Sequence, residues 1–506
     1  MSNRLIYILA MVLLFFQSQA YSQGVLTFVA AHDPNTLDSV LAQTYDEAYV
    51  FMNTLEGIAQ VDESLQVSPA LAESWQVSED QLVYTFRLRK GLKWSDGKPL
   101  TADDFIYAWQ RLLEPKVNSP YNYLLFNITG AKEYASGVEK DFKKVGITST
   151  SQSEIQVRLK RRTSYFLSLL SFWPSFPQRR DLHLAYPDSW FLPEHSVSIG
   201  PYQLKEWRKG VSLKFVVNPH YYGKKPTITR VTALIGEGHE PESDIILSFS
   251  TADFVRLSSQ GAGFNLKKFP YLCLHYLGFN LNSPRFVDRN LRRAVATVLD
   301  QKKVTEDVQR GDRVADSLVP VGLGGYDPTA AIPFNMAALK EITLPKIDPK
   351  AEFVLLTRDG RSLDAAESIR RALMSKLNLN VRVLAVTPSQ FKEHLVRGDM
   401  DMFIGAWGSD YPDAASFAEI FRSDNGHNYV GFKNSTFDHL TENAADVNDA
   451  GERAEYYKVA QRILIRDEVA IVPLYFPLLG ILVKNTVSQV YINPLNHFLF
   501  KNVIMR

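Results

Sequence analysis

Residues 351–407 constrain the fold most strongly, because short apolar runs alternate there with helical patterns. The predicted elements are, in order, strand Phe353–Thr357, helix Leu363–Leu377, strand Val381–Val386, helix Ser389–Val396 and strand Met402–Ala406. The strands are apolar or β-branched, and the first helix repeats apolar residues at a spacing of three and four. This alternation predicts a parallel sheet with right-handed crossovers, and therefore an α/β fold.

The last of these strands points to a binding site. In open α/β sheets, ligands bind beyond the carboxyl ends of the strands. Met402–Ala406 runs directly into Trp407-Gly408-Ser409-Asp410-Tyr411, which places an aromatic ring and a carboxylate at that position. The alternative is that Asp410 only turns the loop, helped by Pro412.

A second regular pattern lies in residues 82–112. Leu82, Tyr84, Phe86 and Leu88 are apolar at every second position, as in a strand with one buried face. Ser95-Asp96-Gly97 is typical of a turn, and Thr101 with Asp104 resembles the capping box of a helix. Phe105, Ala108, Trp109 and Leu112 then form one apolar helix face.

Three blocks around this pattern carry a family resemblance. They are L-A-x-x-W at Leu71–Trp75, Y-x-F-x-L-R at Tyr84–Arg89, and W-S-D-G-x-P-x-T-A-x-D-F at Trp94–Phe105. In this order they resemble the peptide/nickel-type family of bacterial extracellular solute-binding proteins, the ligand-capturing components of ABC importers. The similarity is greatest to its oligopeptide-binding members. It extends over nearly all of residues 25–505 and is weakest at 235–262 and 322–350.

The resemblance implies a two-lobed periplasmic binding protein fold with a hinge and three domains. Lobe I would combine residues 25–47, 180–271 and 479–506, lobe II would be an insertion at 48–179, and lobe III would span 272–478. Connections near 271 and 478 would form the hinge. The 506-residue chain is also longer than one hydrophobic core normally serves.

The resemblance also implies a binding site. In oligopeptide binders, the aspartate of a W-x-x-D-Y block pairs with the α-ammonium of the peptide, and that aspartate is Asp410 here. Two segments, Gln43–Tyr45 and Gly408–Asp410, would pair with an extended peptide backbone. Tyr121 occupies a position that contacts ligand in relatives, although a packing role in lobe II is an equal alternative. The predicted site residues are therefore Gln43, Tyr45, Tyr121, Trp407, Gly408, Ser409, Asp410 and Tyr411.

The chain departs from its relatives at two positions. Close oligopeptide binders carry a cysteine where Gly408 stands, which leaves Cys273 as the single cysteine of the chain. We expect Cys273 to be a small buried hydrophobic residue. Some relatives meet a peptide carboxylate with an arginine where Ile404 stands, so the group that would meet a peptide C-terminus is left open.

Residues 1–20 resemble a cleavable export signal. Arg4 precedes twelve apolar residues, Leu5–Phe16, and Ser18-Gln19-Ala20 supplies small residues for a signal peptidase. A twelve-residue helix is about 18 Å long, too short for a hydrocarbon core of about 30 Å, although an uncleaved anchor remains the alternative. With no cysteine for a lipid anchor at the cleavage site, the resemblance implies a periplasmic location.

Composition and motifs narrow the function. A net charge of +1 offers no footprint for nucleic acid. The sequence lacks H-E-x-x-H, paired cysteines, a G-x-S-x-G elbow and a phosphate-binding loop. Asp399 and Asp401 could suggest a metal pair, but polar residues at a strand entry explain them better. We therefore expect a binding protein with no enzymatic activity, no cofactor and no metal.

The resemblance thus implies a monomeric protein that captures oligopeptides in an interlobe cleft and delivers them to an inner-membrane ABC permease. One alternative is another solute on the same fold, such as a dipeptide, nickel chelate, haem or cell-wall peptide. A peptide receptor or chaperone outside transport is a second alternative. A secreted hydrolase is the most distant one.

Overall fold

The computed structural model describes residues 24–236, 238–239, 242–247, 256–257, 263–308 and 311–506. The predicted signal peptide, residues 1–20, lies outside this range, as do parts of the weakly matching segment 235–262. Among the helices of the described residues, none is both long and apolar enough to cross a membrane.

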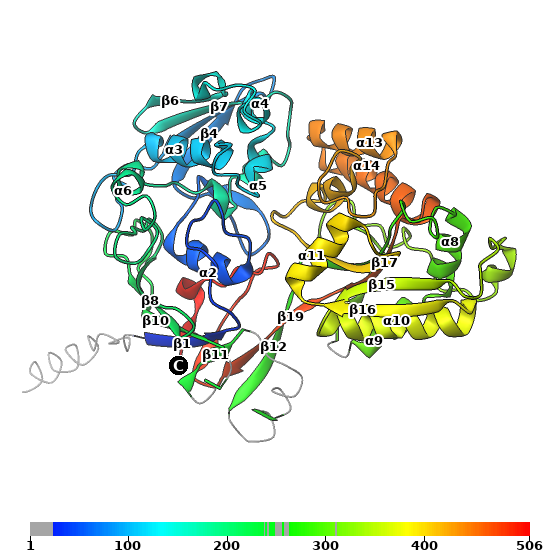
Figure 1. Ribbon diagram of the computed structural model, residues 1–506. Helices are drawn as coiled ribbons and strands as arrows, with labels where there is room; N and C mark the ends of the chain where they lie inside the picture. The colour runs from blue at the N-terminus through cyan, green and yellow to red at the C-terminus, as the bar shows by residue number, and fades with distance from the viewer. Residues whose placement is uncertain (1–23, 237, 240–241, 248–255, 258–262, 309–310) are drawn as a thin grey trace, which may run out of the picture.

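Two bodies face each other across the molecule (Figure 1). As far as the described residues go, one body holds a seven-stranded and a four-stranded sheet, and the other a six-stranded sheet. The seven-stranded sheet runs, in spatial order, β12 (Phe264–Pro270), β19 (Leu478–Lys484), β11 (Ile245–Ile246), β1 (Gly24–Ala30), β10 (Ile228–Ile235), β9 (Ser212–Val217) and β8 (Tyr202–Arg208). The four-stranded sheet runs β4 (Ala72–Val77), β5 (Val83–Leu88), β7 (Glu154–Arg158) and β6 (Ile147–Ser151).

The six-stranded sheet contains the predicted α/β segment. Its spatial order is β14 (Arg313–Val314), β18 (Ile471–Phe476), β13 (Cys273–Phe279), β17 (Met402–Gly408), β15 (Glu352–Arg358) and β16 (Asn380–Val386). β15 pairs in parallel with both β16 and β17, and α10 (Arg361–Leu377) and α11 (Pro388–Arg397) make the connections. Ala366, Ile369 and Leu373 of α10 are fully buried, so the helical spacing correctly identified the core face. The predicted strand–helix alternation is confirmed.

The second sequence pattern is confirmed as well. β5 buries Tyr84, Phe86 and Leu88 on one face. α3 (Ala102–Leu113) starts at Thr101, whose side chain forms a capping box with Asp104. The predicted apolar face of α3 lies completely in the core.

The remaining elements cover the sheets and join them. The helices are α2 (Tyr45–Thr54), α4 (Ala131–Ala135), α5 (Phe166–Leu169), α6 (Arg180–Ala185), α8 (Arg289–Val298), α9 (Gln301–Asp307), α12 (Ala415–Ala418), α13 (Ser435–Asp446) and α14 (Ala450–Arg462). Two short hairpins pair β2 (Ala59–Val61) with β3 (Val67–Pro69) and β20 (Val487–Gln489) with β21 (Ile504–Met505). The glycine- and proline-rich stretch 320–345 is mostly loop, with one 3₁₀ turn at Ala338–Glu341.

The chain crosses between the seven-stranded and six-stranded sheets at two neighbouring places. Tyr271-Leu272 joins β12 to β13, and Pro477 joins β18 to β19. Because β12 pairs with β19 and β13 pairs with β18, these crossings lie side by side. The two-lobed α/β fold is confirmed.

The sheets also bear on our proposed domain bounds. Strands of the seven-stranded sheet come from all three segments assigned to lobe I. The bound at residue 47, however, falls inside α2, where Tyr49 and Val50 pack into the core of that sheet. We therefore move the bound to the end of α2, and the revised division remains a proposal.

Candidate functional site

A cavity of about 220 Å³ lies between the two bodies and gathers most of the predicted site. Its lining includes Gln43, Tyr45, Tyr121, Trp407, Gly408, Ser409 and Asp410. These residues come from the start of α2, from the loop before the 3₁₀ turn Asn122–Leu125, and from the end of β17. The structure therefore brings together residues that lie hundreds of positions apart in the sequence.

Asp410 lies half-buried in the cleft and accepts a hydrogen bond from the opposite body. The Tyr123 hydroxyl donates to its Oδ2 over 3.0 Å. Burial raises the pKa of Asp410 to about 7, although the hydrogen bond from Tyr123 acts in the opposite direction. The sequence reasoning missed Tyr123, for which its position two residues after Tyr121 was the only signal.

Tyr411 is the one predicted residue that does not line this cavity. Its ring is buried and stacks on Tyr165 of the opposite body, with 5.5 Å between ring centroids and 11° between planes. It lines an adjoining cavity of about 530 Å³, which also includes Trp407 and Asp410 in its lining. Tyr411 thus forms a contact between the two bodies. Its contact with a ligand remains a prediction.

Two indole groups in the smaller cavity have unused donors. Within the described residues, Trp407 Nε1 and Trp173 Nε1 are buried and have no hydrogen-bond partner. A buried N–H group without an acceptor costs roughly 1–3 kcal/mol, so these donors suit a ligand that brings carbonyl oxygens. Trp173 was not predicted, because nothing in its sequence surroundings distinguishes it from a core residue.

Gly408 leaves room for a contact between two tyrosines. The Tyr271 hydroxyl donates to the Tyr45 hydroxyl over 2.7 Å. A Cβ atom at Gly408 would lie 2.5 Å from the Tyr45 oxygen and 2.7 Å from the Tyr271 oxygen. Cys273 lies directly opposite Gly408 on β13 and is buried, as expected. A side chain at position 408 would therefore displace the tyrosine pair.

The helix cap of α2 uses two backbone donors of the segment Gln43–Tyr45, which we expect to pair with a peptide. Glu47 accepts hydrogen bonds from the backbone N–H groups of Gln43, over 2.6 Å, and Thr44, over 2.8 Å, as it caps α2. These donors are therefore occupied. A ligand could take hydrogen bonds from this segment only at its other backbone groups, and the pairing of this segment with a peptide remains a prediction.

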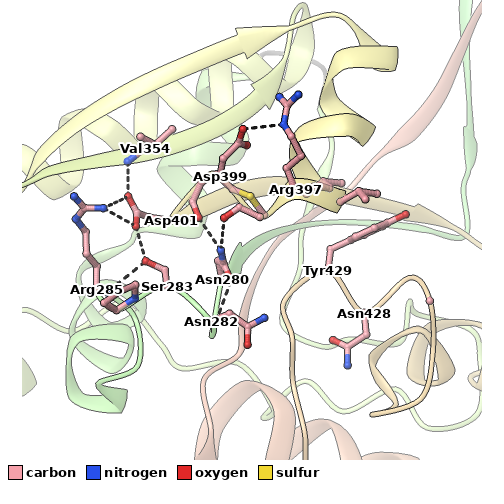
Figure 2. A pocket seen from close by; sticks show the side chains of 16 residues that line it. Asn280, Asn282, Ser283, Arg285, Val354, Arg397, Asp399, Asp401, Asn428 and Tyr429 are labelled. Atoms are coloured by element: carbon pink, nitrogen blue, oxygen red, sulfur yellow. Dashed lines mark hydrogen bonds and ion pairs between the residues drawn. The ribbon is translucent and has the colours of Figure 1, made fainter.

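A larger cavity of about 720 Å³ is a weaker candidate (Figure 2). It is lined only by residues 280–429, which belong to a single body. Its charged groups are already paired with one another, Arg285 with Asp401 over 3.2 Å and Arg397 with Asp399 over 3.1 Å. Asp401 also accepts from the backbone N–H of Val354 at 2.9 Å, which fits the structural role preferred over a metal pair.

The bodies touch around the two smaller cavities. The Tyr165 hydroxyl donates to Glu419 over 2.5 Å, and the Ser164 backbone N–H donates to the Ala445 carbonyl over 3.0 Å. Together with the contact of Tyr123 with Asp410, these bonds connect residues before 180 with residues after 400. A ligand in the cleft would therefore contact both bodies.

Comparison with known proteins agrees with this geometry. The family model of the bacterial extracellular solute-binding proteins, family 5 (middle region), matches residues 66–429. The chain is 27% identical to the probable deoxycholate-binding periplasmic protein YgiS of Escherichia coli K12 over 490 residues, covering 91% of this chain and 89% of that protein. It is 28% identical to the periplasmic oligopeptide-binding protein OppA of Salmonella typhimurium over 499 residues, covering 94% and 90%.

Solved structures show the same fold. The Escherichia coli murein tripeptide binding protein MppA superposes with a TM-score of 0.81 at 24% identity, covering 96% of this chain and 99% of that chain. The OppA of Burkholderia pseudomallei gives a TM-score of 0.80 at 25% identity, with the same coverage. The chain belongs to family 5 of the bacterial extracellular solute-binding proteins.

Proposed function

We propose that this protein captures short peptides in the cleft between its two bodies and delivers them to an inner-membrane ABC permease. One observation carries the choice of ligand. Asp410 is a half-buried carboxylate in the cleft, and no cation among the described residues forms an ion pair with it. A peptide α-ammonium would provide the missing positive charge. The names of relatives such as OppA and MppA support the same ligand class.

Capture would occur by closure about the two crossings at Tyr271-Leu272 and Pro477. A ligand favours the closed form only if it contacts both bodies. Asp410 and Trp407 would hold it from lobe III, and Tyr45, Tyr121 and Trp173 from the opposite body. The closed form would then be the one that the permease recognises.

We further propose that the protein acts in the periplasm as a monomer, after removal of residues 1–20. It would bind its ligand without altering it and without a cofactor or metal. Recovery of the bound peptide unchanged after prolonged incubation with the protein would support this part. Appearance of shorter peptides would instead favour the hydrolase alternative.

Analysis of the molecules carried by the protein would test the ligand class. The full-length chain is exported to a bacterial periplasm, purified without denaturant and then unfolded, and mass spectrometry identifies what is released. We expect short peptides with free amino termini. Release of another solute in stoichiometric amount would overturn the peptide assignment, and so would an empty protein that no peptide pool stabilises.

A further inference from the structure

The positively charged side chains of the cleft line the cavity of about 530 Å³. Its described lining includes Lys132, Lys160 and Arg161 from one body and Arg422 from the other. The smaller cavity has neither lysine nor arginine in its described lining. Because Asp410 borders both cavities, a ligand amine there would place the rest of a short ligand within reach of these cations.

Arg422 and Arg161 differ in how their charges are compensated. Arg422 contacts Glu442 over 2.5 Å and Asp424 over 3.3 Å. Arg161 forms no side-chain hydrogen bond or ion pair with any described residue, and its Nε is buried without an acceptor. Guanidinium groups have five N–H donors and keep their charge, so a half-buried arginine without an acceptor is costly. Of these two arginines, Arg161 is therefore the one that can still bind an anion.

The backbone around Arg161 is held on both sides. The N–H of Lys160 donates to the Asn127 carbonyl over 2.9 Å, within lobe II. Three residues after Arg161, Ser164 makes the backbone contact with Ala445 on the opposite body. Arg161 thus sits where the two bodies meet, and its position depends little on a mobile loop. Its neighbour Lys160 is exposed and has a lowered pKa, chiefly from desolvation and then from the charge of Arg161.

The acidic residues of this cavity leave Arg161 available. Glu419 accepts from the Tyr165 hydroxyl, and Glu442 is bound to Arg422. No ion pair among the described residues joins either of them to Arg161, although the positive charge of Arg161 acts to lower the pKa of both carboxyl groups. Ile404, where some relatives place an arginine, is fully buried in the core. A ligand anion in this cleft would therefore find its cation on the lobe II side.

We propose that Arg161, with Lys160 beside it, binds a carboxylate of the ligand whose ammonium pairs with Asp410. This inference rests on the proposed function and narrows the ligand to short peptides that carry both charges. The carboxylate could be the peptide C-terminus or an acidic side chain. A charge-assisted, forked contact of this kind contributes roughly ten- to a hundredfold in affinity.

A competition experiment tests the proposal. The mature protein is incubated with a pool of tripeptides without acidic residues, half with a free C-terminus and half amidated, and bound peptides are quantified by mass spectrometry after gel filtration. A second pool is amidated and carries glutamate as its last residue. We expect free acids to be enriched at least about tenfold over plain amides by the wild type.

The variants are Arg161→Gln and, as a matched control, Arg162→Gln. Arg162 is exposed, lies outside the cavity lining and donates to the Asp80 carbonyl over 3.2 Å. Arg161→Gln should abolish the preference for carboxylates yet still bind amidated peptides and unfold at or above the wild-type temperature. Arg162→Gln should keep the preference. If the amidated peptides that end in glutamate bind better than the plain amides, the carboxylate that Arg161 binds can be a side chain. If they do not, it is the peptide C-terminus.

Two outcomes would overturn the inference. Equal binding of free acids and amides by the wild type would reject the role of Arg161 and leave peptide capture intact. Retention of no peptide in any form would reject both proposals together.

Discussion

The Tyr123 hydroxyl donates a hydrogen bond to the Asp410 carboxylate across the interlobe cleft, with 3.0 Å between the two oxygens. The two residues belong to opposite bodies and lie 287 positions apart. Tyr123 is neutral, so it satisfies one oxygen of Asp410 without neutralising its charge. The carboxylate is therefore held in place in the cleft, and it has no ion-pair partner in the part of the chain that the structure describes.

Asp410→Ala should lower the affinity for a peptide with a free amino terminus by about 3–5 kcal/mol, because the ammonium would be left in the cleft without its partner. Isothermal titration calorimetry with one tripeptide measures the change. Asp424→Ala is the matched control. Asp424 lines the cavity of about 530 Å³, but its side chain is exposed and already contacts Arg422. A loss below about 1 kcal/mol for Asp410→Ala, the value of an exposed ion pair, would remove Asp410 as the amine anchor.

Peptide affinity should fall as the pH is lowered. The pKa of Asp410 is about 7 in the unliganded protein, and only the ionised carboxylate attracts an ammonium. Below pH 7 the affinity should drop by up to about tenfold per pH unit, and binding at neutral pH should release protons. Titrations in two buffers of different ionisation enthalpy measure the proton release. A pH-independent affinity between pH 5 and 7 would contradict this role of Asp410.

Asp410 should also affect the stability of the unliganded protein. Its pKa is raised on folding, so between about pH 4 and pH 7 the unfolded chain ionises while the folded protein keeps its proton. The stability that this group contributes is complete below pH 4 and is lost as the pH rises to 7. Asp410→Asn lacks this loss, so its unfolding temperature should rise relative to the wild type across that interval. A constant difference between the two proteins would show that burial does not perturb Asp410.

Gly408→Ala should destabilise the protein by about 1–3 kcal/mol, because the added Cβ would overlap the Tyr45 and Tyr271 hydroxyl oxygens. Removing both oxygens with Tyr45→Phe and Tyr271→Phe should restore most of that loss, as measured by chemical unfolding. Gly426→Ala serves as the control, since a Cβ there meets no atom within 4 Å. Failure of the double replacement to rescue Gly408→Ala would place the strain elsewhere.

The sequence predicted those features that depend on local periodicity. The elements of residues 351–407 follow from their apolar spacing, and the place of Asp410 at the sheet edge follows from the strand that precedes it. The ligand role of Asp410 is predicted by the family resemblance. The side on which Tyr411 lies did not follow, because the chain turns after β17 and strand alternation no longer applies. The partnership of Asp410 with Tyr123 depends on the packing of two bodies, and no local pattern encodes such a contact.

The start of α2 at Tyr45 is a second feature that the sequence analysis did not predict. The match to relatives predicts that the segment Gln43–Tyr45 pairs with the backbone of an extended peptide. The capping box of α2 uses the backbone donors of Gln43 and Thr44. A Thr-x-x-Glu pattern, Thr44 to Glu47, was present in the sequence and could have indicated this helix start.

Thermal unfolding of the mature protein, residues 21–506, shows whether the cleft binds peptides through their free α-ammonium group. It is measured with a mixed pool of tri- to pentapeptides and again with the same pool N-acetylated. A ligand at 100 times its dissociation constant stabilises the folded state by about 2.7 kcal/mol, which gives a clear rise in the unfolding temperature. We expect the unfolding temperature to rise with the free peptides and to stay unchanged with the acetylated ones. Equal shifts with both pools, or no shift with either, would contradict this expectation.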